Sequence, residues 1–167
     1  MAFIADGSTT ISFADMNDVQ SVDQRLFDNN ESLTDEFVED ALIRTTGRIL
    51  DRIRNTNWWL DLYSERNSNV TSRIDIPRPN PDRIKAREDD FTDLCVYEAM
   101  ADRILPAVAD FGEPDNSERQ KMGYYKNRAD SLFLELVNAG DWYDFDGDSS
   151  IATVEKKAGR VTLKRVR

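Results

Sequence analysis

The sequence contains no histidine, and this absence removes several kinds of chemistry at once. Ser-His-Asp triads, Cys-His dyads, histidine-ligated zinc sites and histidine proton shuttles are excluded. The one cysteine, Cys95, cannot form a disulfide within the chain or a cysteine-rich zinc site. The seven glycines do not cluster into a P-loop or a GxGxxG motif. We therefore expect a protein that is not an enzyme and that carries no organic cofactor.

Long hydrophobic runs are absent as well. No segment approaches the roughly 20 consecutive apolar residues of a membrane helix, and the first residues, Met1 to Gly7, lack the basic region of a signal peptide. We therefore expect no contact with a membrane, and a protein made and kept in the cytoplasm or in an assembly formed there. The 167 residues fit a single domain with its own core.

Positive charge is scarce in most of the chain. The net charge is −10, yet residues 156–167 hold six basic residues and no acidic one, which leaves a net charge of −16 on residues 1–155. An acidic body repels nucleic-acid phosphates. A basic tail on such a body suits docking to an acidic partner or to a neighbouring copy, and the alternative is a solvated, frayed terminus.

The spacing of the apolar residues predicts a mainly α fold. We expect a bundle of three long helices and one short helix, a long proline-containing loop, and a strand-like basic C-terminal tail. An N-terminal extended arm covers residues 1–14, a helical bundle domain covers 15–143, and an acidic turn with the basic tail covers 144–167. The expected helices span 15–28, 35–55, 80–106 and 117–139, and the extended loop spans 63–80.

Capping residues define the expected helix ends. Thr34 suits the N-cap of the first long helix, and Asn80 suits that of the second, with Pro81 at the first helical position. Pro106 kinks or ends the second helix. Gly140 suits the left-handed position just after the third helix.

Trp58 and Trp59 belong to the most aromatic short stretch of the chain. Adjacent residues on a helix or strand point in different directions. We therefore expect one indole to be buried and the other to lie at a partner-binding surface, because tryptophan is enriched at interface hot spots. The alternative is burial of the pair in the core at a helix end.

The segment 144–155 resembles a twelve-residue calcium loop. Asp144, Asp146, Asp148 and Glu155 occupy positions 1, 3, 5 and 12, where carboxylate oxygens bind a hard cation. Position 6 is Ser149, where the motif has a glycine. Calcium is therefore the one candidate cofactor, and the alternative is an acidic turn that caps the third helix.

The residues from Phe13 to Arg54 resemble the opening of the head–tail connector, or neck adaptor, proteins of tailed bacteriophages. The segments that carry the resemblance are Phe13-Ala-Asp, Asp18-Val19, Arg25-Leu-Phe-Asp28 and Thr34-Asp35, followed by the long helix pattern. The end of the chain is similar too, with Tyr124 and Tyr125, then Trp142-Tyr-Asp-Phe-Asp-Gly-Asp148 and a basic tail.

This resemblance implies a structural virion protein at the neck, assembled in the host cytoplasm. Such proteins form a ring of copies, commonly twelve, between the portal protein and a stopper or tail-completion protein. DNA passes through the lumen without specific binding. The tail, which alternates like a strand from Gly159, would add to a portal sheet. Its partner-binding residues would be Arg160, Val161, Leu163, Lys164, Arg165, Val166 and Arg167.

Three further expectations remain open from the sequence. The proline-bearing loop is the candidate contact with the next neck component. A calcium-binding regulatory module would rest on the acidic turn instead. A non-viral helical protein–protein adaptor would use Trp58 and Trp59.

Overall fold

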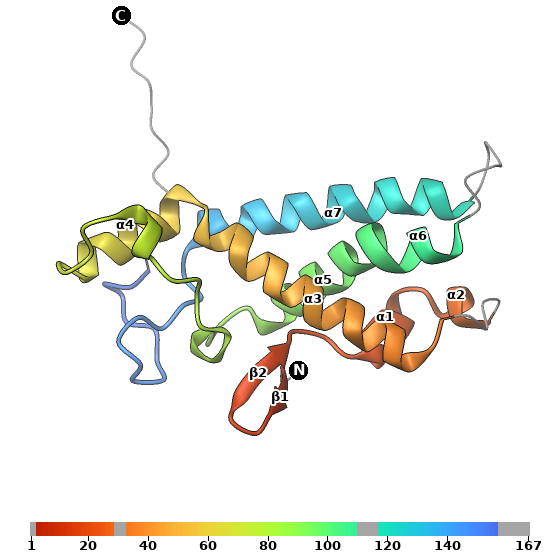
Figure 1. Cartoon of the computed structure of the whole chain (residues 1–167), viewed down its shortest axis with the longest axis horizontal. Helices are drawn as coiled ribbons and strands as arrows, with labels where there is room; N and C mark the ends of the chain where they lie inside the picture. Colours follow the sequence, from red (N-terminus) through yellow and green to blue (C-terminus); the bar gives the residue numbers. More distant parts are fainter. Residues whose placement is uncertain (1–2, 29–32, 110–116, 157–167) are drawn as a thin grey trace, which may run out of the picture.

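The computed structural model describes residues 3–28, 33–109 and 117–156. These residues form a mainly helical fold, as the sequence predicts, with one small two-stranded sheet. Figure 1 shows an elongated bundle in which a β-hairpin projects from one side. A short helix and the C-terminal turn lie together at one end.

The segment that the sequence predicts as an extended N-terminal arm pairs with itself. Strands β1 (Ile4–Asp6) and β2 (Thr9–Ser12) form an antiparallel hairpin. Gly7 turns the chain between them with a φ of 64°. Phe13 follows the hairpin and is 1% exposed, so the base of the arm is locked into the core.

The expected helix at 15–28 is divided into two. Helix α1 (Met16–Val22) begins with a capping box, because the side chains of Asp15 and Asp18 each accept the other's backbone N–H. Asp23 ends it, and α2 (Gln24–Asp28) follows. The prediction of one continuous helix was wrong, because Asp23 leaves the helical conformation, with a φ of −147° and a ψ of 76°, and its carboxylate pairs with Lys121 of α7.

Helix α3 (Asp35–Arg54) matches the sequence prediction closely. Thr34 caps it, with its hydroxyl accepting the Phe37 N–H at 3.3 Å. After a short break the chain enters α4 (Asn57–Arg66), which is capped by Thr56. The loop after α4 contains the short 3-10 helix η1 (Arg73–Asp75) and begins later than expected, because α4 includes residues 63–66.

The second long helix starts eight residues later than the sequence predicts. Asn80 and Pro81 do begin a helical turn, but it is only the 3-10 helix η2 (Pro81–Arg83). Helix α5 (Glu88–Ala99) begins after Arg87, whose φ is 58°. Ile84 instead forms an isolated antiparallel bridge with Tyr143, and this long-range pairing keeps the chain extended between the two helices.

The second helix continues for two residues past Pro106. Helix α5 continues into η3 (Met100–Ile104), a π-helical segment, and then into α6 (Leu105–Val108). A π-turn relaxes the usual hydrogen-bond register, which accommodates a proline that has no N–H to donate.

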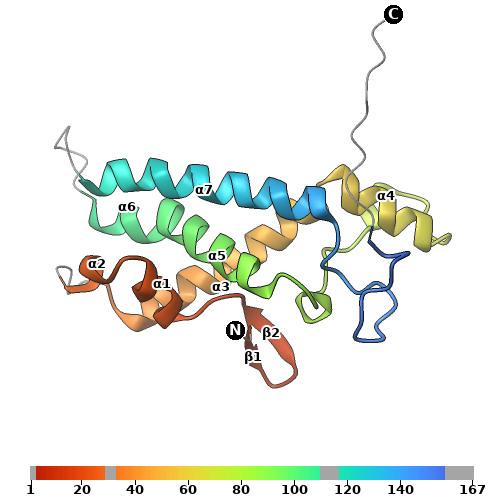
Figure 2. The ribbon, with the colours of Figure 1, turned by 180° about the vertical axis from the view of Figure 1, so that it is seen from behind.

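Helix α7 (Ser117–Ala139) lies along α5, η3 and α6, as Figures 1 and 2 show from opposite sides. Gly140 follows it with a φ of 57° and donates its N–H to the Leu136 carbonyl at 3.1 Å. The predicted C-terminal end of this helix is therefore confirmed.

Candidate functional site

The end of the molecule that carries α4 brings together the predicted site residues that the structure describes, namely the two tryptophans and the acidic turn. Both tryptophans of α4 are buried, with Trp58 9% and Trp59 1% exposed. The expectation that one indole lies at a surface was wrong, and the core alternative holds. The reason is that the C-terminal segment folds over them, with ring centroids 4.9 Å apart for Trp58–Trp142 and 5.5 Å apart for Trp59–Phe145.

These rings continue into the centre of the bundle. Trp142 contacts Phe91 at 4.8 Å between centroids, and Phe91 contacts Phe13 at 5.4 Å. Aromatic pairs of this kind contribute beyond their buried area. The N-terminal motif that begins at Phe13 and the C-terminal motif that begins at Trp142 therefore share one core.

The acidic turn after this aromatic segment is ordered by its own backbone. Asp144 is 1% exposed, and its carboxylate accepts the N–H groups of Gly147 at 2.6 Å and Ser149 at 2.9 Å. Burial alone would raise the pKa of Asp144, but these two donors, together with Asp146 and the positive charge of Arg83, hold the pKa below its ordinary value. Ser149 has a φ of 69°, the left-handed conformation for which the calcium motif uses glycine.

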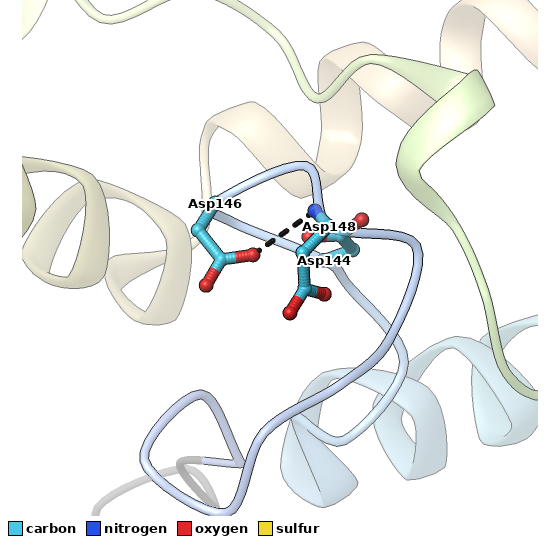
Figure 3. A group of neighbouring side chains, drawn as sticks. All are labelled: Asp144, Asp146 and Asp148. Atoms are coloured by element: carbon cyan, nitrogen blue, oxygen red, sulfur yellow. Dashed lines mark hydrogen bonds between the residues drawn. The ribbon is translucent and has the colours of Figure 1, made fainter.

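Three of the four expected metal ligands lie together. Carboxylate oxygens of Asp144, Asp146 and Asp148 all lie within 4.8 Å of one another (Figure 3). Asp146 and Asp148 are exposed. Such a group supplies the oxygen ligands that Ca²⁺ prefers.

Glu155 does not join this group. It is 1% exposed, and its Oε1 accepts the N–H groups of Phe145 at 2.8 Å and Asp146 at 3.2 Å. Its Oε2 accepts the Ala152 N–H at 2.9 Å. In a calcium loop the carboxylate at this position binds the ion. Here the Glu155 carboxylate binds backbone N–H groups of its own turn instead.

Two arginines attach the turn to the rest of the fold. Arg66 of α4 donates to the Val154 carbonyl at 3.0 Å and lies 4.6 Å above the Phe145 ring. Arg83 of η2 donates to the Phe145 carbonyl at 2.8 Å. The sequence alone does not indicate either arginine, because their contacts join residues 62 and 88 positions apart.

The proline-bearing loop is fixed in a similar way. Arg54 donates to the carbonyls of Ile74 at 2.9 Å and Ile76 at 2.7 Å. The indole N–H of Trp59 donates to the Pro77 carbonyl at 2.8 Å. Ile76 is buried at 1% exposure, whereas Ile74 is 82% exposed. The loop therefore presents Ile74 outward from a fixed backbone.

A cavity of about 410 Å³ lies between α4, η2 and the acidic turn. Its volume falls within the range of small ligand or side-chain sites. Its wall combines aromatic rings with two guanidinium groups and one exposed carboxylate. The lining residues are Trp59, Tyr63, Arg66, Asn67, Arg83, Tyr143, Phe145 and Asp146.

A second charged cluster lies at the centre of the bundle. Glu98 of α5 is 3% exposed, and Arg52 of α3 donates to its Oε2 at 2.7 Å. The Arg48 Nε lies 3.2 Å from Oε1 without the alignment of a hydrogen bond. Arg52 also pairs with Asp130 of α7 at 3.0 Å. Arg52 therefore links α3 to α5 through Glu98 and to α7 through Asp130.

The tail residues expected to bind a partner, from Arg160 to Arg167, lie outside the described residues. Among the residues that the structure does describe, no helix combines the length and the apolar character needed to cross a membrane. Comparisons with family models, with curated proteins and with solved structures gave no match.

Proposed function

We propose that this protein is a non-enzymatic structural adaptor of a tailed-bacteriophage virion. Copies of it form a ring that joins the portal vertex of the head to a stopper or tail-completion protein and extends the DNA channel. The identification of the family rests on the sequence resemblance, and the mainly helical fold agrees with what that resemblance implies.

The observation that carries the proposal is the anchoring of the segment before the basic tail. Glu155 is buried and accepts three backbone N–H groups, and Arg66 holds the neighbouring Val154 carbonyl. The basic tail is therefore attached to a residue, Glu155, that is fixed at the α4 end of the molecule. A fixed origin reduces the conformational entropy lost when such a segment binds a partner.

The charge distribution also supports the proposal. Residues 1–155 carry a net charge of −16. A ring built from this body has a lumen that repels phosphates, so DNA passes without adhering. Retention of duplex DNA by the purified chain at physiological salt would contradict this part of the proposal.

The decisive experiment is a pull-down from a native infected-cell lysate, with partners identified by mass spectrometry. The full-length chain should recover the portal protein, whereas a chain ending at Glu155 should not. Recovery of no capsid component would refute the adaptor proposal, and recovery of the portal protein by both chains would refute the docking role of the tail.

A matched variant keeps the length of the tail and changes only its charge. In this variant Arg160, Lys164, Arg165 and Arg167 are replaced by glutamate. We expect it to lose the portal protein as the truncated chain does, because acidic groups on the partner would now be repelled. Unchanged recovery would mean that the basic charges take no part in docking. A non-viral adaptor is distinguished by the same experiment, since it would bind its partner without residues 156–167.

The second candidate, a calcium-binding regulatory module, is favoured by the grouping of Asp144, Asp146 and Asp148. Calorimetric titration with calcium chloride separates the two candidates. Heat with micromolar affinity in the full chain, lost in Asp146→Asn, favours the calcium module. No heat favours the adaptor, in which the acidic turn is a structural anchor held by Glu155.

A further inference from the structure

The charged cluster around Glu98 borders a cavity of about 250 Å³, here called the charged cavity. It lies between α3, α7 and the continuous helix formed by α5 and η3, and it shares no lining residue with the aromatic cavity beside α4. Each helix contributes two charged side chains that are four residues apart and therefore lie on one face. These pairs are Arg48 and Arg52, Glu98 and Asp102, and Lys126 and Asp130.

Glu98 gives the charged cavity a buried carboxylate oxygen that lacks a donor. The residue is 3% exposed, and its Oε2 accepts a hydrogen bond from Arg52 at 2.7 Å. Its Oε1 is the one buried side-chain oxygen or nitrogen in the described residues without a hydrogen-bond partner, because the Arg48 Nε at 3.2 Å is not aligned to donate. An unpaired buried acceptor costs free energy. Glu98 Oε1 therefore points to a donor supplied by a bound molecule.

The acidic side chains reach deeper into the charged cavity than the basic ones. The side chains of Glu98 and Asp102 are 4% and 23% exposed, whereas the three bases are 30–59% exposed and the third acid, Asp130, lies at the rim. Water and salt screen exposed charges more than buried ones. The inner part of the cavity is therefore negative, although acids and bases are equal in number, and it favours a cation.

The size of the charged cavity is set by two small side chains. Ala101 of η3 and Ala129 of α7 are both buried and line it. The π-helical segment η3, which carries Ala101 and Asp102, is of a kind that occurs frequently at functional sites. The volume of about 250 Å³ is smaller than that of a site for a drug-sized ligand. It therefore suits a small molecule.

The spacing of the carboxylates favours an organic cation over a metal ion. In the part of the chain that the structure describes, the acidic turn is the one group of three carboxylates close enough to share a metal ion. Glu98, Asp102 and Asp130 are therefore too far apart to do so. An ammonium group, in contrast, needs only separate oxygen acceptors for its N–H donors.

We propose that the charged cavity binds a small organic amine in its ammonium form. The ammonium donates a hydrogen bond to Glu98 Oε1, and the Asp102 carboxylate beside it adds attraction. The Lys126 ammonium, which lies 3.8 Å from Asp102 Oδ1, competes with the ligand for that oxygen. This site goes beyond the proposed function and does not depend on it, because all of its groups belong to three helices of one chain.

Titration of the purified, ¹⁵N-labelled chain with ethylammonium chloride tests the proposal by NMR, with the ionic strength held constant by sodium chloride. The amide signals of Ala101, Asp102 and Ala129 should shift and saturate. Tetramethylammonium has the same charge but no N–H, and ethylene glycol donates hydrogen bonds without a charge. Both should bind at least about tenfold more weakly than ethylammonium. Shifts that do not saturate, or an equal response to either control compound, would overturn the proposal.

Two substitutions test the residues of the charged cavity in opposite directions. Glu98→Gln keeps an oxygen for Arg52 but removes the charge, so ethylammonium should bind at least about tenfold more weakly. Lys126→Met removes the competing ammonium, so ethylammonium should bind roughly threefold more tightly. A merely structural role of Glu98 does not explain tighter binding in a variant of an exposed lysine.

Lys85→Met is the matched control, because it removes the same charge from a lysine that does not line the charged cavity. Its affinity for ethylammonium should stay close to that of the wild-type chain. Unchanged affinity in a folded Glu98→Gln variant would overturn the proposal. Should Glu98→Gln fail to fold, Lys126→Met decides, and binding no tighter than in Lys85→Met would overturn the proposal.

Discussion

Replacing Glu155 with glutamine tests whether the acidic turn is held by its own backbone. Glutamine keeps one oxygen, which can still accept the Phe145 and Asp146 N–H groups. Its amide NH₂ then faces the Ala152 N–H, which loses its acceptor. Losing one charge-assisted hydrogen bond costs about 1.5–3 kcal/mol, and the two remaining bonds weaken to neutral ones. We expect a total destabilisation of about 3 kcal/mol for the closed turn.

The assay has a local and a global readout. Amide hydrogen exchange of Phe145, Asp146 and Ala152 should accelerate on the order of a hundredfold, because about 3 kcal/mol corresponds to slightly more than two factors of ten. If the turn unfolds together with the body, the Tm should fall by roughly 6–12 °C. Asp148→Asn is the matched control, because it removes a charge from the same turn and keeps the oxygen that accepts the Ser150 N–H. Unchanged exchange in Glu155→Gln would refute the anchoring argument.

The remaining predictions concern the same turn and the bundle. Because the folded pKa of Asp144 lies below its ordinary value of 3.8, its contribution to stability is present above that pH and is lost as the pH falls through the folded pKa. Tryptophan fluorescence should therefore report opening of the turn in acid, and an identical profile in Asp144→Asn would contradict this. Glu98→Gln should cost about 1–2 kcal/mol in urea unfolding, since it weakens the charge-assisted hydrogen bond from Arg52, while Arg52 keeps Asp130 as a partner. A change below ~0.5 kcal/mol would count against this. Gly147→Ala should cost about 1–2 kcal/mol, because Gly147 has a φ of 82° and an added Cβ would lie 3.1 Å from the Arg83 guanidinium. A variant as stable as wild type in thermal denaturation would refute this.

Local sequence features were sufficient to predict a helix end wherever that end depends only on residues within one turn of it. Thr34 caps α3 and Gly140 follows α7 as predicted, because a cap needs only a side-chain oxygen or a left-handed residue within one turn. The same holds for Asp144, Asp146 and Asp148, whose alternate spacing in a tight turn brings their carboxylates together.

The candidate site was predictable only in part, because its other members come from distant segments. Glu155 has the correct position for a calcium ligand, yet it binds the backbone of the turn instead. Arg54, Arg66 and Arg83 look like ordinary surface charges in the sequence, and their role appears only where they meet carbonyl groups of other segments. Nothing in the local pattern distinguishes them from other arginines.

The amino-acid sequence by itself determined the helical class, the boundaries of α3 and the C-terminal end of α7, and the excess of acid over base in the body. Tertiary structure decided the rest. The Ile84–Tyr143 bridge delays α5, and the Trp142–Phe145 segment buries both tryptophans of α4. Local propensities amount to fractions of a kilocalorie per mole per residue, whereas burying a large aromatic side chain contributes several times more. Long-range burial therefore prevailed wherever the two competed.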